Sequence, residues 1–229
     1  VLLGWFSGQV LAAEEGLLDL EVDHDSGKVI LHLNDLPAEF LYVAGLQSGA
    51  GSNDLGLDRG QLSRTRLVRF ERFGDKVLLI EPNLAFRANT DKEPESRAVD
   101  EAFAQSVLAG FEIADPSARP ISIDLAPLLL SDLPRISDRL AQLEQGEFTI
   151  DPERSAVATN EIRNFPGNTL MPAILTFGGT SVGNFVSDVT PTPDSLTLRV
   201  IHQFVQLPEA GYQPRKFHPR SGYFALSYR

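Results

Sequence analysis

The amino-acid sequence predicts an α+β fold, mostly an antiparallel β-sheet meander with two short helices in the middle of the chain. The first observation is the alternation of apolar and polar residues before residue 90, in runs of strand length separated by turn residues. The second is a change to helical spacing at about residues 98–110 and 126–143. The third is the return of alternation after residue 150, which places the helices between two groups of strands.

The strands before residue 90 form two predicted hairpins and one further strand. In the first hairpin, Leu and Val alternate with acids, and the His-Asp-Ser-Gly sequence at 24–27 supplies the turn. The second hairpin turns at Gly74 and Asp75, a pair that is typical of tight β-turns. The predicted strands cover residues 18–22, 29–33, 40–46, 67–73 and 77–80.

The two helices are predicted from apolar spacing and from the residues that end them. Apolar residues lie at helical spacing up to Gly110, so we expect the first helix at about 98–110. Within the second stretch, 126–143, Pro134 predicts a break between a short helix and a longer one. Further short strands are predicted at residues 111–113, 121–124, 156–162, 173–177 and 196–204.

Composition narrows the function classes. The chain has 229 residues, 42% of them hydrophobic and 22% charged, which is enough for one large globular domain. Twenty Lys and Arg against 31 Asp and Glu give a net charge of −11, which repels a phosphate backbone and argues against nucleic acid as a partner. The absence of cysteine excludes disulfides, thiolate metal sites and cysteine nucleophiles.

The ends of the chain predict its domain organisation. Residues 1–13 carry no charge and end in small residues before Glu14, which is typical of the end of a secretory signal peptide. Alternatively, residues 2–10 form a buried strand or a short helix of the domain. This apolar segment is too short to span a bilayer, so we expect no integral membrane protein and a secreted, periplasmic or cell-envelope location. Residues 14–213 are predicted to form a single β-rich domain. The missing initiator Met and an apparent strand at 223–226 lead us to expect a fragment.

The densest polar segment is a glycine-rich loop at residues 49–61, called the 49–61 loop below. Its oxygen-bearing side chains Asn53, Asp54 and Asp58 offer ligands for calcium, and Arg59 offers a fork that fits a peptide terminus. Alternatively, these side chains bond to the loop's own main chain, and Arg59 pairs with Asp54 or Asp58. The second interpretation predicts an ordered structural element. The glycine spacing matches no phosphate-binding motif.

No other cluster in the sequence predicts a catalytic or metal centre. The four histidines lack the H-E-x-x-H spacing of a zinc site, and we expect separate roles for them, although distant histidines can also meet in a fold. The acidic run at residues 19–25 predicts a solvated strand face, with calcium binding as the alternative. The histidines are His24, His32, His202 and His218.

Four separated blocks of the sequence resemble a bacterial family of secreted zinc-dependent metalloproteases. The similarity is to the N-terminal domain of these proteases, a domain of unknown function. The last block resembles the family's D-x-R-x-G-Y-F junction, but His218 stands where the family has an acid. The blocks include residues 51–61, 68–72 with 77–83, 164–169 with 175–177, and 214–224.

The resemblance implies a role for the chain and assigns no catalytic residue in it. In such proteases a catalytic module follows the junction, binds zinc through an H-E-x-x-H helix and hydrolyses peptide bonds. Residues 214–229 are therefore interpreted as a junction toward that module, and no zinc ligand or other cofactor is expected in this chain. The implied partners are the chain's own C-terminal protease module and a protein or peptide substrate.

Two functions of different kinds follow from these features of the sequence. The first is an N-terminal accessory or scaffold domain of a secreted or envelope zinc metalloprotease, inactive by itself. The alternative is a non-enzymatic surface module that binds a ligand or a glycan through the 49–61 loop. A hydrolase that uses Asp54 and Asp58 as a carboxylate pair needs a raised pKa on one of them, and the sequence around them predicts no such environment.

Overall fold

Two antiparallel sheets make up most of the computed structural model, which describes residues 16–86, 88, 90–208, 211 and 220. The larger sheet has nine strands and the smaller has three. The strands are β1 (Asp19–Asp23), β2 (Lys28–Leu33), β3 (Ala38–Leu46), β4 (Arg66–Phe73), β5 (Lys76–Glu81), β6 (Ser106–Glu112), β7 (Ile121–Asp124), β8 (Glu147–Ile150), β9 (Ala156–Val157), β10 (Arg163–Phe165), β11 (Asn168–Thr180) and β12 (Ser195–Val205).

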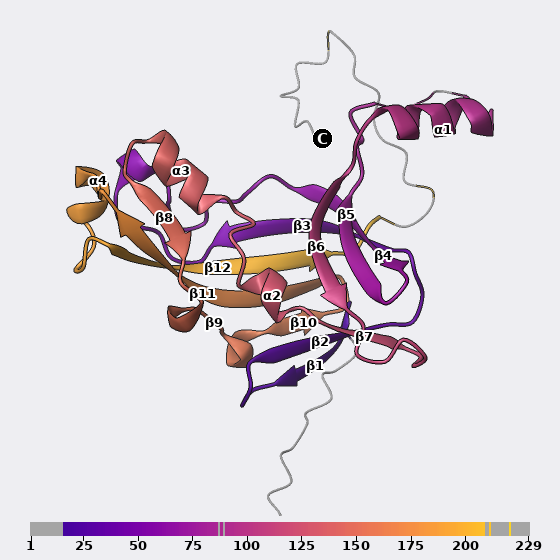
Figure 1. Ribbon diagram of the computed structural model, residues 1–229, viewed down its shortest axis with the longest axis horizontal. Helices are drawn as coiled ribbons and strands as arrows, with labels where there is room; N and C mark the ends of the chain where they lie inside the picture. Colours follow the sequence, from indigo (N-terminus) through magenta and orange to yellow (C-terminus); the bar gives the residue numbers. More distant parts are fainter. Residues whose placement is uncertain (1–15, 87, 89, 209–210, 212–219, 221–229) are drawn as a thin grey trace, which may run out of the picture.

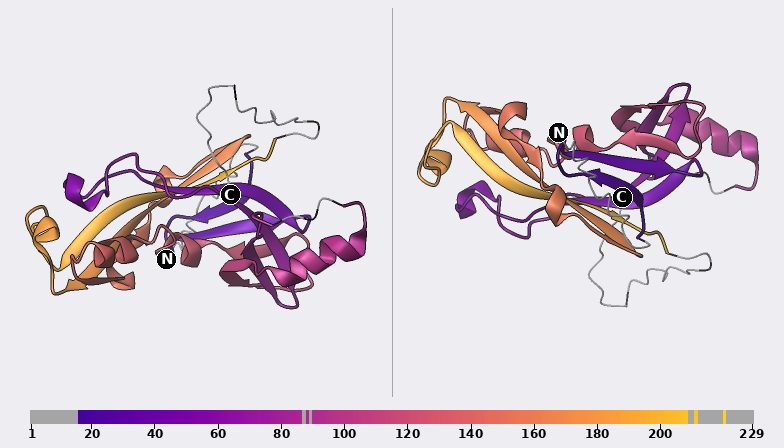
Figure 2. Two further views of the ribbon diagram at one scale, coloured as in Figure 1. Left: turned by 90° about the horizontal axis from the view of Figure 1, so that it is seen from above. Right: turned by 90° about the horizontal axis from the view of Figure 1, so that it is seen from below.

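The helices are short and lie around the sheets (Figure 1). In the larger sheet, the main path runs β10-β11-β12-β3-β4-β5-β6, and β8 and β9 also pair with β11; the smaller sheet runs β1-β2-β7. The helices are α1 (Glu93–Ala102), α2 (Ala126–Leu129), α3 (Ile136–Gln142) and α4 (Asn184–Ser187), with 3-10 turns η1 (Asn53–Leu55), η2 (Pro152–Arg154) and η3 (Thr159–Glu161). Figure 2 shows that the larger sheet curls, with the long strands β11 and β12 bent along the molecule.

The alternation in the sequence predicted both N-terminal hairpins correctly. β1 and β2 pair antiparallel, with the predicted turn between them. β4 and β5 pair in the same way around Gly74, whose φ of +65° lies in the left-handed region that glycine adopts without strain. Along β12 the buried and less buried residues alternate, as the pattern at 196–204 predicts. The predicted fold class, mostly antiparallel β with short helices, is therefore confirmed in this coarse form.

The helix predicted at about 98–110 is wrong in position. The helix α1 ends at Ala102, and residues from Ser106 onward form the edge strand β6. The apolar spacing continues by coincidence from the last turns of α1 into β6. Val107 and Phe111 favour extended structure, and their pairing with Ile80 and Val77 of β5 determines the conformation.

Of two other predicted boundaries, one is wrong and one is correct. The stretch 156–162 is not one strand, because only Ala156–Val157 pairs with β11 before the 3-10 turn η3 begins. The break predicted at Pro134 is correct: α2 lies before it and α3 after it, since proline lacks the main-chain N–H and its ring conflicts with a preceding turn. The Asp132 carboxylate accepts a hydrogen bond of 2.7 Å from the N–H of Ile136 and so caps α3.

Asn164 fixes the first strand to the larger sheet. Its side-chain amide donates to the carbonyl of Leu18 at 2.6 Å, and its oxygen accepts from the Leu18 N–H at 3.3 Å and from the Thr169 hydroxyl at 2.6 Å. A Cβ atom at Gly16 would lie 2.1 Å from the Asn164 Cγ, so the approach requires glycine. Together with the main-chain hydrogen bond from the Leu17 N–H to the carbonyl of Phe165 at 2.8 Å, these bonds attach the start of the smaller sheet to the β10–β11 hairpin.

Some sequence predictions fall outside the described residues. The signal peptide at 1–13, the strand at 223–226 and His218 all lie there. In the junction predicted at 214–229, the structure describes only Arg220. The single domain predicted over 14–213 stays a prediction.

A buried polar pair lies inside the apolar core. The Tyr42 hydroxyl and His202 Nδ1 are 2.7 Å apart, and neither side chain is exposed. Burial lowers the pKa of His202 to about 4, and the carbonyl of Leu129 offsets this in part, although Nε2 makes no hydrogen bond of good geometry. Burial also raises the pKa of the Tyr42 hydroxyl well above its ordinary value, opposed by the charge of Arg66.

Arg66 is itself nearly buried and faces Glu81 across the β4–β5 hairpin. Its Nε lies 3.3 Å from the Glu81 carboxylate but makes no hydrogen bond of good geometry, so this pair is electrostatic. The same carboxylate accepts from the exposed Arg64 at 2.6 Å. Glu81 therefore compensates the buried guanidinium and links the start of β4 to the end of β5.

The buried histidine predicts a loss of stability in mild acid. Because the folded pKa of about 4 lies below the ordinary value of 6.5, the unfolded chain binds a proton first as the pH falls. Titration of His202 therefore leaves the unfolding free energy unchanged above about pH 6.5. Between about pH 6.5 and pH 4 it lowers the unfolding free energy progressively, by about 3 kcal/mol at most. Urea unfolding at closely spaced pH values measures it.

His202→Gln removes the titrating ring and keeps an acceptor for Tyr42, so its unfolding free energy is expected to vary less than that of the wild type across this window. His24→Gln is the matched control, because His24 lies exposed in the β1–β2 turn. Equal pH slopes for the wild type and His202→Gln between pH 4 and 6.5 would contradict the assignment.

Candidate functional site

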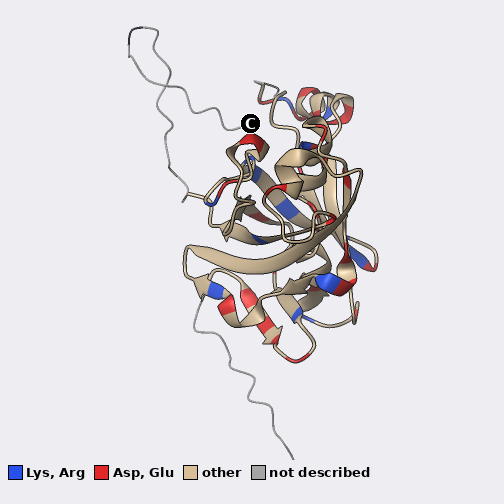
Figure 3. Ribbon diagram, turned by 90° about the vertical axis from the view of Figure 1, so that its left-hand side faces the viewer, with Lys and Arg blue, Asp and Glu red and all other residues tan. Residues whose placement is uncertain are grey.

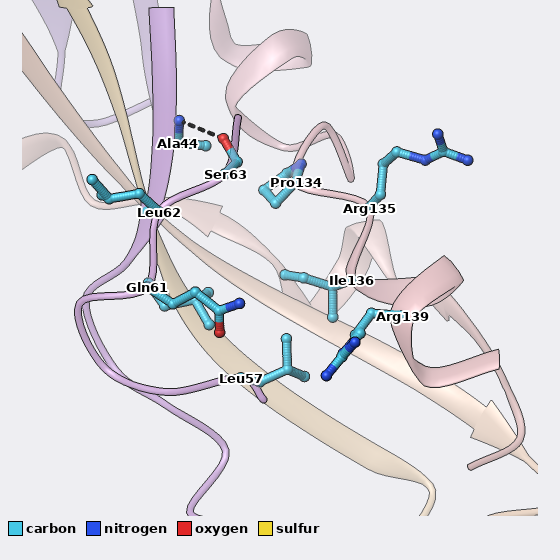
Figure 4. A pocket seen from close by; sticks show the side chains of 11 residues that line it. Ala44, Leu57, Gln61, Leu62, Ser63, Pro134, Arg135, Ile136 and Arg139 are labelled. Carbon is cyan, nitrogen blue, oxygen red and sulfur yellow. Dashed lines mark hydrogen bonds between the residues drawn. The ribbon is translucent and has the colours of Figure 1, made fainter. Parts of the chain in front are cut away.

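The candidate site is a small cavity between the 49–61 loop and helix α3, called the loop–α3 cavity. It has a volume of about 140 Å³. The end of β3 forms its floor, and Leu57, Leu62, Pro134 and Ile136 supply most of its apolar lining (Figure 4). The residues that line it are Ala44, Gly45, Leu46, Leu57, Gln61, Leu62, Ser63, Pro134, Arg135, Ile136 and Arg139.

Main-chain hydrogen bonds hold the 49–61 loop against β3. The N–H of Gly60 donates to the carbonyl of Leu46 at 2.7 Å, and the N–H of Leu46 donates to the carbonyl of Gln61 at 2.9 Å. Within the loop, the N–H of Ala50 donates to the carbonyl of Leu57 at 2.8 Å. Leu57 is buried, so the loop is closed by its own backbone and by its apolar side chains.

Arg139 of α3 joins the loop from the other side of the cavity. Its Nε donates to the carbonyl of Leu55 at 3.0 Å, across 84 positions of sequence. Gly56, the next residue, has a φ of +58°, and a Cβ atom there would lie 2.5 Å from the Arg139 Nη2. Glycine therefore provides both the turn of the loop and the space for the guanidinium.

The polar groups around the cavity differ in how they are engaged. Ser63 Oγ accepts from the Ala44 N–H at 3.0 Å. Arg135 forms an ion pair with Asp138, and its guanidinium points away from the cavity in Figure 4. The side chains of Gln61 and Arg139 point toward it. Among the described residues, no carboxylate forms an ion pair with Arg139.

The structure does not bring the residues predicted from the loop sequence together. Asn53 and Asp54 lie on η1, Asp58 and Arg59 follow it, and all four side chains are exposed. In the described part of the chain, Arg59 forms no ion pair with Asp54 or Asp58, contrary to our expectation. The loop's order comes from the main chain, from Leu55 and from Arg139 instead.

The remaining sequence candidates are also separate. His32 bonds to Ser122 at 2.8 Å and lies 3.6 Å from Glu21, whereas His202 lies in the core. Asp23 accepts from the main chain of the β1–β2 turn, and the Ser26 hydroxyl that also bonds to it is the largest cause lowering its pKa. Within the residues that the structure describes, no three His, Asp or Glu side chains are grouped to hold a metal ion.

A larger hollow of about 480 Å³ lies beside α1, and its arginine, Arg69, is already paired. The Arg69 Nη2 donates to the Gln105 carboxamide at 3.3 Å, and the Arg69 Nε lies 3.1 Å from Glu71. Phe86 and Phe103 stack on each other at its edge, with ring centroids 3.7 Å apart. The guanidinium of this hollow is therefore neutralised, unlike that of Arg139.

The charges on the surface are mixed in sign. In the side view of Figure 3, Lys and Arg positions are scattered among Asp and Glu positions, with no continuous basic face on the described ribbon. None of the described helices combines the length and the apolar character needed to cross a membrane.

The fold and the site define a mostly antiparallel β domain with a loop-bounded cavity. Residues 60–229 match the family described as Domain of unknown function (DUF5117). Because this match covers more than half of the chain, the chain belongs to that family. No curated protein and no solved structure gives a significant match. The match begins at Gly60, so β1, β2, β3 and most of the 49–61 loop precede it.

The sequence pattern found the loop and missed its partner. Apolar spacing identified the helix that contains Ile136 and Arg139, but nothing in the sequence places this helix beside residues 49–61. The one indication of such a contact in the sequence was Gly56, because a glycine can mark a position where another group approaches the main chain closely. The sequence does not say which group approaches.

The two arginines around the loop are expected to differ in their effect on stability. Arg59→Ala should change the unfolding free energy by no more than about 0.5 kcal/mol, since Arg59 is exposed and pairs with neither loop carboxylate. Arg139→Ala removes the hydrogen bond to Leu55 and should cost about 1 kcal/mol. Urea midpoints of the two variants measure the difference. A larger loss of unfolding free energy for Arg59→Ala would instead support the ion pairs of Arg59 that the sequence predicted.

Proposed function

We propose that this chain is an N-terminal accessory or scaffold domain of a secreted or envelope zinc metalloprotease, and that peptide hydrolysis belongs to a module outside residues 1–229. The proposal rests first on the resemblance of the sequence blocks to such proteases. Its structural support is that the described blocks contain residues that hold strands together. A domain whose motifs serve its own architecture is suited to a positioning role.

Two of these blocks show the pattern. In the block at 164–169, Asn164 and Thr169 bond to each other, and Asn164 also bonds to Leu18. In the block at 77–83, Glu81 compensates the nearly buried Arg66. These contacts are internal to the domain, and they give Asn164, Thr169 and Glu81 a structural role.

The attachment point of the last described strand also supports a scaffold role. β12 is paired along its length with β11 and along its second half with β3. After it, the N–H of Gln206 donates to the carbonyl of Gly167 at 3.0 Å. A module joined beyond this point would be connected to an interior strand, which restricts its movement relative to the sheet.

The proposal predicts where proteolytic activity is found. The purified 229-residue chain should not cleave unfolded casein in the presence of zinc, whereas the protein encoded by the same gene continued past Arg229 should cleave it in a chelator-sensitive way. An H-E-x-x-H sequence in the continuation is expected. Chelator-sensitive cleavage by the 229-residue chain alone, or a stop codon soon after Arg229, would contradict the proposal.

If the motif residues have a structural role, replacing one of them should lower the stability of the protein without lowering the proteolytic activity of the folded molecules. Asn164→Ala should lower the unfolding free energy by about 2 kcal/mol, because Leu18 loses its partners. In the longer protein, casein cleavage per folded molecule should stay unchanged at a temperature where the variant is folded. Asn160→Ala, an exposed position on η3, is the matched control. Lost cleavage by a folded Asn164→Ala variant would make Asn164 part of a working surface instead.

The alternative that we propose is a non-enzymatic surface module that binds a ligand or a glycan beside the 49–61 loop. The loop–α3 cavity supports it, because an apolar hollow with a few converging polar groups is the usual form of a small-molecule site. The cavity lies behind the loop, next to Leu57 and Gln61, so the exposed Asp54 and Asp58 are not its lining residues.

A further inference from the structure

We propose that the loop–α3 cavity binds a carboxylate next to a compact branched or aromatic side chain, as at the C-terminal residue of a peptide. This inference rests on the alternative function above and names the chemistry of its ligand. Three observations carry it: the size of the cavity, the apolar character of its walls, and the position of Arg139.

The size of the cavity limits the apolar group. Its volume is about 140 Å³. An engineered protein cavity of about 150 Å³ with apolar walls binds benzene. The side chain of leucine or phenylalanine is therefore of a size that this space accommodates.

The walls favour an apolar group over a polar one. Leu57 and Ile136 are buried and line the cavity, and Leu62 borders it while 61% of its surface is exposed. Leu62 is the most exposed of the large hydrophobic residues that the structure describes. A ligand side chain that enters the cavity would cover Leu62 and remove apolar surface from water on both molecules.

Arg139 supplies the charge that a carboxylate needs. The bond from its Nε to Leu55 fixes the guanidinium at the cavity, and Gly56 leaves the space that it occupies. No hydrogen bond or ion pair to another described residue engages its Nη atoms, and a guanidinium matches a carboxylate through two parallel hydrogen bonds. Arg135, one turn earlier, is already paired with Asp138 and points away.

Gln61 adds a group for the rest of the ligand. Its side-chain oxygen accepts from the Asp58 N–H at 3.3 Å, so its amide nitrogen remains to donate. In Figure 4 this side chain points toward the cavity from the loop side, opposite Ile136 and Arg139 of α3. An acyl-amino acid offers a carbonyl to Gln61, a carboxylate to Arg139 and a side chain to the space between them.

The test uses N-acetyl-L-leucine and N-acetyl-L-leucinamide as probes. They have the same size and shape, and only the first carries a carboxylate. Titration of the ¹⁵N-labelled 229-residue chain, followed by amide chemical shifts, should give a dissociation constant of about 1 mM for the acid. The shifts should concentrate at Leu57, Leu62 and Ile136. The amide probe should bind about ten-fold more weakly.

Three variants separate the contributions. Arg139→Gln should weaken binding of the acid about ten-fold and leave that of the amide unchanged. Arg97→Gln, at an exposed position on α1 outside the cavity, is the control for the loss of one positive charge and should bind as the wild type does. Leu62→Ala keeps a folded chain, since Leu62 is exposed, and should weaken both probes several-fold by removing apolar contact.

Four outcomes would overturn the proposal: no binding of the acid at about 10 mM, equal binding of the two probes, shifts located away from the cavity, or equal losses in Arg139→Gln and Arg97→Gln. The failure of the alternative function is distinguishable from these. If a glycan array shows binding that Asp54→Ala abolishes while N-acetyl-L-leucine does not bind, the loop is a binding site and the carboxylate assignment is wrong.

Discussion

The pairing of β12 with both of its neighbours is the interaction on which the rest of this structure depends. β12 pairs with β11 from Ser195 to Val205 and with β3 over its second half, so it joins the C-terminal hairpin to the N-terminal strands. His202 and Phe204 on its buried face contact Tyr42 from β3. Because this ladder connects segments far apart in sequence, its formation carries the entropic cost of closing the long loop between them.

The same ladder places the loop–α3 cavity. β3 pairs with β12 as far as Leu46, the last residue of the strand, and the 49–61 loop that follows turns back to bond to it. Helix α3 then closes the other side through Arg139. Hydrogen bonds hold the loop to β3 near its C-terminal end and to Arg139 near its centre. Between these attachments lies a space that the buried Leu57 and Ile136 do not fill.

Local patterns in the sequence predict the local part of this fold. The hairpins β1–β2 and β4–β5 follow from alternation and turn residues, and Pro134 marks the break between α2 and α3. The helix at 98–110 could not be placed, because the choice between helix and strand there depends on pairing of Val107 with β5. The same reason limits the prediction of the site. Its loop can be predicted from glycine and Asx residues, whereas the contact of this loop with Arg139 joins residues far apart in sequence and cannot.

The strand β3 lies in the middle of the larger sheet but outside the region that the family match covers. The family match begins at Gly60, after β3, yet β3 lies between β12 and β4. A chain that began at Gly60 would expose the facing edges of these two strands and leave Phe204 and Phe70 without Phe40. Unpaired edges with apolar faces promote association between molecules. The matched region of this chain, taken alone, therefore lacks the strand that makes the sheet continuous.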